Sequence, residues 1–69
     1  MRAYRKLAMH KRVMVNLTTG EAISGILFDD RGPIVQIRDA SLHNDGGHAP
    51  LDGEVLIERD RISFVQVVS

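Results

Sequence analysis

Two histidines and an aspartate share one glycine-rich stretch, and these side chains are the best suited in the chain to bind a metal. His43, Asp45 and His48 lie within six residues. Imidazole nitrogens and a carboxylate are ligands that zinc accepts at an open site. The competing interpretation is a solvated loop, because Gly46 and Gly47 separate the ligands and no third histidine is close in the sequence. We expect the loop, with no metal and no other cofactor.

Other residues of catalytic type lack the surroundings that catalysis needs. Asp29 and Asp30 are adjacent in a turn-like stretch, so their carboxylates are expected to point apart into solvent. Ser24 and Ser41 are not in the G-x-S-x-G setting of an activated serine, and no glycine-rich phosphate loop precedes a helix. The sequence therefore predicts a protein that is not an enzyme.

Charge is divided unevenly along the chain, although the formal net charge is zero. Residues 1–12 contain five basic and no acidic residues, whereas residues 13–69 contain four arginines and nine acidic residues. A basic segment of this kind can dock on nucleic-acid phosphates or on the acidic body of a neighbouring copy. The candidate contacts in this segment are Arg2, Arg5, Lys6, Lys11 and Arg12.

The elements that position these residues follow from apolar periodicity. The apolar residues of the first eight positions cluster on one face of a helical wheel, which predicts a short α-helix over residues 1–11. Residues 13–28 alternate apolar and polar side chains around a turn at Thr19 and Gly20, which predicts a β-hairpin with one apolar face. Gly25 occupies a core-facing position of this hairpin, so we expect a sharp bend or a close backbone approach there.

The remaining strands are expected at residues 34–42, 51–59 and 62–68, separated by a turn at residues 29–33 and a loop at residues 43–50. The predicted fold is mostly β: a helix over 1–11 followed by a five-stranded, strongly bent open barrel over 12–69. All 69 residues are expected to form a single domain.

Length and composition exclude several other classes. A chain of 69 residues buries only about 60% of its unfolded surface, and the absence of cysteine rules out disulfide support. No apolar run approaches the ~20 residues of a membrane span, and the first residues lack a signal-type apolar core. We therefore expect an intracellular or virion protein without a membrane partner, stabilised by self-association.

The order of the predicted elements and the spacing of their apolar residues resemble the Sm-like superfamily, the small bent barrels that include Sm, Lsm and Hfq proteins. The strongest part of the resemblance is V-x-V-x-L-x-x-G-x-x-I-x-G-x-L over residues 13–27, and I-S-F-V-Q-V over residues 62–67 adds weaker support. Members of this superfamily usually form rings in which the last strand of one subunit pairs with the fourth strand of the next. An uncharged apolar edge strand such as this one is normally covered by a partner. The resemblance thus implies a homo-oligomer with an interface formed by Val55, Ile57, Ile62, Phe64, Val65, Val67 and Val68.

The RNA pocket of the superfamily is altered in this sequence. The first Sm motif places an aromatic residue or histidine and an asparagine after an aspartate, but here the matching turn reads Asp-Asp-Arg-Gly-Pro over residues 29–33. The second motif has arginine followed by glycine, where this chain has Glu58 and Arg59. Only Asp30, Arg31 and Arg59 remain as candidate contacts to a nucleic acid or an acidic partner.

These observations favour a non-catalytic oligomerising module that serves as a structural or adaptor subunit of a larger assembly, for which a bacteriophage virion is one setting. The alternative is a ring that binds RNA or DNA through the basic face of the predicted helix.

Overall fold

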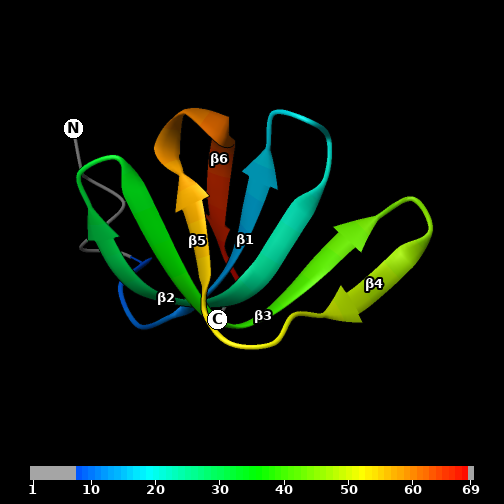
Figure 1. Cartoon of the computed structure of the whole chain (residues 1–69), viewed down its shortest axis with the longest axis horizontal. Helices are drawn as coiled ribbons and strands as arrows, with labels where there is room; N and C mark the ends of the chain where they lie inside the picture. The colour runs from blue at the N-terminus through cyan, green and yellow to red at the C-terminus, as the bar shows by residue number, and fades with distance from the viewer. Residues whose placement is uncertain (1–7, 69) are drawn as a thin grey trace.

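The computed structural model describes residues 8–68, which form a strongly bent antiparallel sheet (Figure 1). Six strands alternate with short turns, and a single turn of 3-10 helix, η1 (Arg59–Arg61), precedes the last strand. The strands are β1 (Arg12–Leu17), β2 (Ala22–Arg31), β3 (Ile34–Asn44), β4 (Gly47–Pro50), β5 (Val55–Glu58) and β6 (Ile62–Val67).

The strand order is β4-β3-β2-β1-β6, and β5 pairs with the first half of β3 while β4 pairs with its second half. The long strands β2 and β3 are strongly curved, and the β3–β4 hairpin extends away from the rest of the sheet (Figure 1). Within the described residues, β6 pairs only with β1, and β5 pairs only with β3. The sheet therefore has one unpaired edge on β6 and another along β4 and β5.

The bend predicted at Gly25 is present. A Cβ atom built at Gly25 would lie 2.4 Å from Ile37 Cγ2 and 2.6 Å from the Arg38 carbonyl oxygen, which are distances that real Cβ atoms do not adopt. The register of β2 and β3 shifts at this point, and Asp39 on β3 has a positive φ of 51°. A bulge of this type bends a strand, so glycine is needed here because the backbones approach too closely for any side chain.

The core lies on the concave side of the sheet and follows the predicted alternation. Val13 and Val15 of β1 face inward together with Leu27 of β2, and all three are almost fully buried. Backbone hydrogen bonds from His10 to Leu27 and from Leu27 to Lys11 hold the chain before β1 against β2. The buried apolar residues are Ala8, Val13, Val15, Ile23, Leu27, Val35, Ile37, Ala40 and Ile57.

The prediction of a helix followed by five strands is wrong. The sheet contains six strands, and no α-helix is present among the elements of residues 8–68. Most of the predicted helix, residues 1–7, lies outside the described residues, and positions 9–11 form a turn and a bend before β1. Accordingly, no helix in the described part of the chain is long and apolar enough to cross a membrane.

Two segments predicted as turn or loop are strand. Residues 29–31 continue β2, so that the turn shrinks to Gly32 and Pro33. The predicted loop over residues 43–50 is the end of β3, a turn at residues 45–46 and the additional strand β4. The predicted strand over residues 51–59 is correspondingly short and begins at Val55.

Candidate functional site

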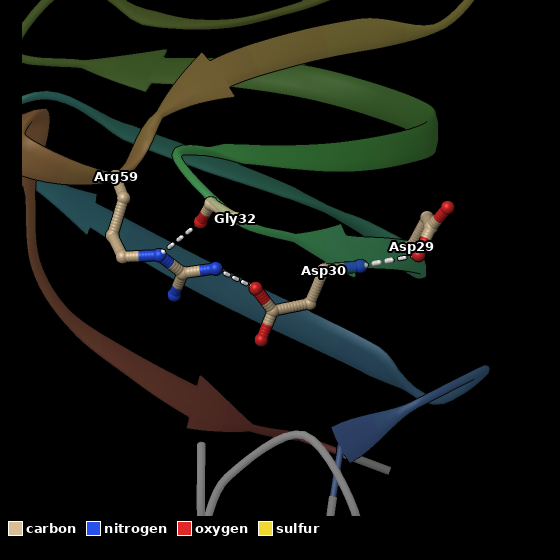
Figure 2. A network of polar contacts seen from close by, with 4 residues as sticks. All are labelled: Asp29, Asp30, Gly32 and Arg59. Carbon is tan, nitrogen blue, oxygen red and sulfur yellow. Dashed lines mark hydrogen bonds and ion pairs between the residues drawn. The ribbon is translucent and has the colours of Figure 1, made fainter. Parts of the chain in front are cut away.

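An ion pair closes the end of the barrel where the β2–β3 turn meets η1 (Figure 2). Asp30 is the one charged residue among the buried residues described, and its carboxylate accepts a hydrogen bond from the guanidinium of Arg59. Arg59 Nε also donates to the Gly32 carbonyl oxygen at 2.8 Å. Because one side chain bonds both β2 and the turn, Arg59 fastens η1 to the β2–β3 hairpin.

The other charged residues at this end also form pairs within the chain. Arg31 lies 3.3 Å from Asp29, and Arg61 lies 3.6 Å from Glu58 three residues earlier. We call the residues of these pairs and the turn between them the polar end: Asp29, Asp30, Arg31, Gly32, Glu58, Arg59 and Arg61. Every arginine of the polar end therefore faces a carboxylate of the same chain.

A shallow cavity of about 450 Å³ opens beside the polar end. None of the described residues that line it is aromatic, so they offer a nucleobase no stacking platform, and the carboxylates among them would repel phosphate. The lining residues are Pro33, Ile34, Glu58, Arg59 and Asp60.

The predicted contacts to nucleic acid or an acidic partner are thus spread over different environments. Asp30 is buried, the Arg59 side chain is 29% exposed, and the Arg31 side chain is 83% exposed. Lys11 and Arg12 are exposed where the chain enters β1. The remaining predicted contacts, Arg2, Arg5 and Lys6, lie outside the described residues.

Apolar side chains gather on β5, β6 and the residue after β6. The four large hydrophobic residues with the greatest exposure are Leu56 (65%), Phe64 (55%), Val68 (52%) and Val67 (44%). We call these four the apolar edge residues. The other large apolar side chains of the described residues are wholly or partly buried.

The predicted oligomer interface divides into three groups in the structure. Ile57 is a core residue, only 6% exposed. Val55, Ile62 and Val65 are partly buried against the core. Phe64, Val67 and Val68 are exposed and available for contact.

Leu56 was missed by the sequence reasoning, although a signal was present. Val55 and Ile57 face the core, so the side chain between them must point to the opposite face of β5. An apolar residue at an outward-facing position of an edge strand indicates a contact outside the chain.

An open groove of about 370 Å³ runs beside β5. Its apolar lining combines Leu17 and Ile23 from the β1–β2 hairpin with residues 55–57 of β5, and Glu21, Glu58 and Arg61 add charge. The groove joins the unpaired edge of β5 to partly buried core residues, so a chain seated there would extend both the sheet and the core.

The residues considered for zinc are arranged differently from the expected loop. His43 and His48 are directly opposite each other on β3 and β4, while Asp45 lies in the turn between them. Within residues 8–68, no group of three or more His, Cys, Asp or Glu residues is arranged to hold a metal ion.

The architecture defines the chain as a small, strongly bent antiparallel β-barrel protein. Neither a protein-family model nor a curated protein sequence matches the chain. Solved structures do match: a heptameric archaeal Sm protein has a TM-score of 0.84 at 24% identity, with 97% of this chain and 98% of the other covered. The SmAP1 heptamer of P. aerophilum gives the same TM-score and identity over 97% and 90% of the two chains.

A third match is the Sm protein of Pyrococcus abyssi in complex with a uridine heptamer, with a TM-score of 0.85 at 22% identity over 96% of this chain and 94% of the other. Likeness along nearly the full length of three Sm proteins establishes that this chain has the Sm-like fold. The resemblance inferred from residues 13–27 and 62–67 is therefore confirmed at the level of the fold.

Proposed function

We propose that this protein is a non-catalytic structural or adaptor subunit that assembles with copies of itself through β5 and β6. The observation that carries the proposal is the position of the apolar edge residues, which lie on or directly after the two strands with unpaired edges. Unpaired strand edges with apolar side chains pair with another chain unless charge or proline protects them. None of the six residues of β6 is charged or proline.

The groove beside β5 supports the same assembly. A strand of a second copy that pairs with β5 would cover Leu56 and fill the groove with apolar side chains such as Phe64. A chain of 69 residues gains stability from such burial because its own core is small. Two of the similar structures are described as heptamers, which supports a closed arrangement of copies.

The proposed role within the cell or particle is that of a scaffold. The oligomer would join other proteins in a larger assembly, and its exposed basic residues Lys11 and Arg12 would contact an acidic partner. An intracellular complex and a bacteriophage virion are the two settings that we propose.

Binding of RNA or DNA is the second candidate function. Its support is the exposure of Lys11 and Arg12, together with the presence of a uridine heptamer in the complex of the Pyrococcus abyssi Sm protein. The polar end argues against base recognition, because its arginines are paired with carboxylates and no aromatic residue is among the described residues that line its cavity.

Self-association is tested by light scattering on the purified chain. We expect a mass several times 7.7 kDa for the wild type and a fall toward 7.7 kDa for Val67→Lys. Assembly would bury the added ammonium group in the interface, and burial of a charge without a counter-charge is costly. Thr18→Lys is the matched control, since Thr18 is exposed in the β1–β2 turn. A wild-type mass of one chain at high concentration would refute the proposal.

Titration with labelled uridine heptamer and duplex DNA at two salt concentrations separates the two candidates. The structural role predicts no binding even at low salt. Binding that weakens steeply with salt, and that is lost in the Lys11→Ala Arg12→Ala variant, would favour the second candidate, since phosphate contacts depend on salt in this way.

A further inference from the structure

The β3–β4 hairpin places two imidazole rings side by side. His43 and His48 are cross-strand partners, with ring centroids 5.5 Å apart and ring planes inclined by 28°. Paired strands take the place of the solvated loop expected between these residues, although no third ligand joins the two histidines within the described part of the chain.

This spacing suits two ligands of one metal ion. A zinc–nitrogen bond is about 2.0–2.1 Å, so two imidazoles on one tetrahedral ion have ring centroids roughly 5 Å apart. The observed separation of 5.5 Å is close to this value. The rings are stacked rather than converging, so binding of one ion by both requires rotation of the exposed His48 side chain.

A hydroxyl group fixes the orientation of the first imidazole. Ser24 Oγ lies 2.8 Å from His43 Nε2, and Ser24 and His43 are both partly buried. When Nε2 donates its proton to the serine oxygen, Nδ1 carries the free lone pair. Partners of this kind commonly hold a metal-binding imidazole in its ligating tautomer.

We propose that His43 and His48 bind one divalent transition-metal ion of the zinc class, and that Ser24 is the positioning residue. The described residues offer two imidazole ligands and no third side chain, so water completes the coordination. Imidazole ligands favour zinc, nickel and copper over magnesium, which prefers oxygen. The pair lies on β3 and β4, so this inference stands independently of assembly through β5 and β6.

Metal binding would add a contact to β4, a strand with few contacts of its own. All four residues of β4 are exposed, and within the described residues β4 pairs only with β3. An ion that binds only the paired strands stabilises the hairpin, and this stabilisation grows with the logarithm of the free ion concentration once that concentration exceeds the dissociation constant.

The test is a titration of the tag-free full chain with zinc chloride at about pH 7.5, because metal binding is pH-dependent and competes with protonation of the ligands. Calorimetry is expected to show one ion per chain. His43→Ala and His48→Ala should each weaken binding by tenfold or more, and Ser24→Ala by a smaller factor. His10→Ala is the matched control and should leave the affinity unchanged, because His10 lies against Phe28 and not against the pair. Magnesium should give no heat.

Amide NMR spectra recorded during the same titration supply a second measurement. Zinc should shift residues 22–24 and 41–50 and leave β5 and β6 unchanged. If an alanine variant loses the hairpin, His43→Gln and His48→Gln provide the same comparison with more conservative side chains. Equal zinc affinity in the wild type and the His48 variants, or a loss caused by His10→Ala, would overturn the proposal.

Discussion

The polar end and the apolar edge residues are neighbours in the sequence, because Leu56 precedes residues 58–61 of the polar end and Phe64, Val67 and Val68 follow them. Three of the four charged residues at positions 58–61 are paired within the molecule: Arg59 bonds Asp30 and Gly32, and Arg61 lies beside Glu58. Leu56, two residues before this segment, and Phe64, three residues after it, leave most of their apolar surface exposed. Most charged side chains of this segment are thus paired within the chain, whereas the apolar side chains on either side of it are exposed to solvent.

This contrast bears on the kind of partner that the protein accepts. A phosphate ligand would have to compete with Asp30, Asp29 and Glu58 for the three arginines of the polar end. An apolar partner meets no such competition at Leu56 or Phe64. Burial of exposed apolar surface lowers the free energy of the system. The comparison therefore favours protein contacts at β5 and β6 over nucleic-acid contacts at the polar end.

Breaking the ion pair at the polar end should have the largest effect on stability. Arg59→Ala leaves the buried carboxylate of Asp30 without its guanidinium, and loss of one partner of a buried pair costs about 3–5 kcal/mol. We expect the lower part of this range, because Arg59 is partly exposed. The measurement is the free energy of unfolding in urea.

Arg31→Ala is the matched control for this change. The Arg31 side chain is 83% exposed and neither partner is fully buried, and solvent-exposed pairs contribute below about 1 kcal/mol. Equal losses in the free energy of unfolding for the two variants would show that burial of Asp30 does not make its ion pair stronger than the exposed one. The pair of Asp30 and Arg59 would then not be a main support of the fold.

The polar end also shows where sequence reasoning fails. The sequence places Asp29, Asp30 and Arg31 in a turn because they precede Gly32 and Pro33, a pair that does not fit inside a strand ladder. Asp30 is buried because Arg59, 29 positions later, supplies the compensating charge, and local sequence does not contain that pairing. Residues 43–50 were misjudged for a related reason. Their glycines, histidines and proline show no alternation, and strand β4 forms only because β3 offers it a backbone to pair with.

The apolar strands were predictable because their signal is local. Alternation in β1 and β2 depends on residues two positions apart, and Val13, Val15 and Leu27 are buried as that alternation requires. The candidate interface on β5 and β6 follows instead from the resemblance to Sm-like proteins, and it stays a prediction. Its most exposed member, Leu56, required attention to the outward-facing side of an edge strand.

Gly25→Ala tests the bend in β2 that gives the sheet its barrel shape, on which both the polar end and the apolar edge residues lie. The added methyl group would meet Ile37 and the Arg38 carbonyl oxygen at impossible distances, so the strands must separate. Overpacking of this kind costs about 1–3 kcal/mol. The midpoint of urea unfolding should fall accordingly, and the mass measured by light scattering should fall as well if the bend positions β5 and β6 for assembly.

Gly46→Ala is the control for the glycine comparison. The nearest atom to its Cβ would be Asn44 Oδ1 at 3.4 Å, which a small side-chain shift accommodates. The change in stability should stay within about 0.5 kcal/mol, as for most surface substitutions. An equal loss of stability in both variants would show that the close backbone approach at Gly25 does not exclude a side chain there.

The smallest effect on folding is expected at Leu56, and here the contrast is with its neighbour on β5. Leu56→Ala removes a side chain that is 65% exposed, so the free energy of unfolding should change by about 0.5 kcal/mol or less. Ile57→Ala removes a core side chain that is 6% exposed and should cost about 2–5 kcal/mol. Both variants are to be measured with Val67→Lys present, so that assembly does not contribute to stability. Without Val67→Lys, Leu56→Ala should still lower the mass seen by light scattering. A large folding loss at Leu56 would mean that this side chain supports the chain's own fold, and that β5 is not a surface kept for a second copy.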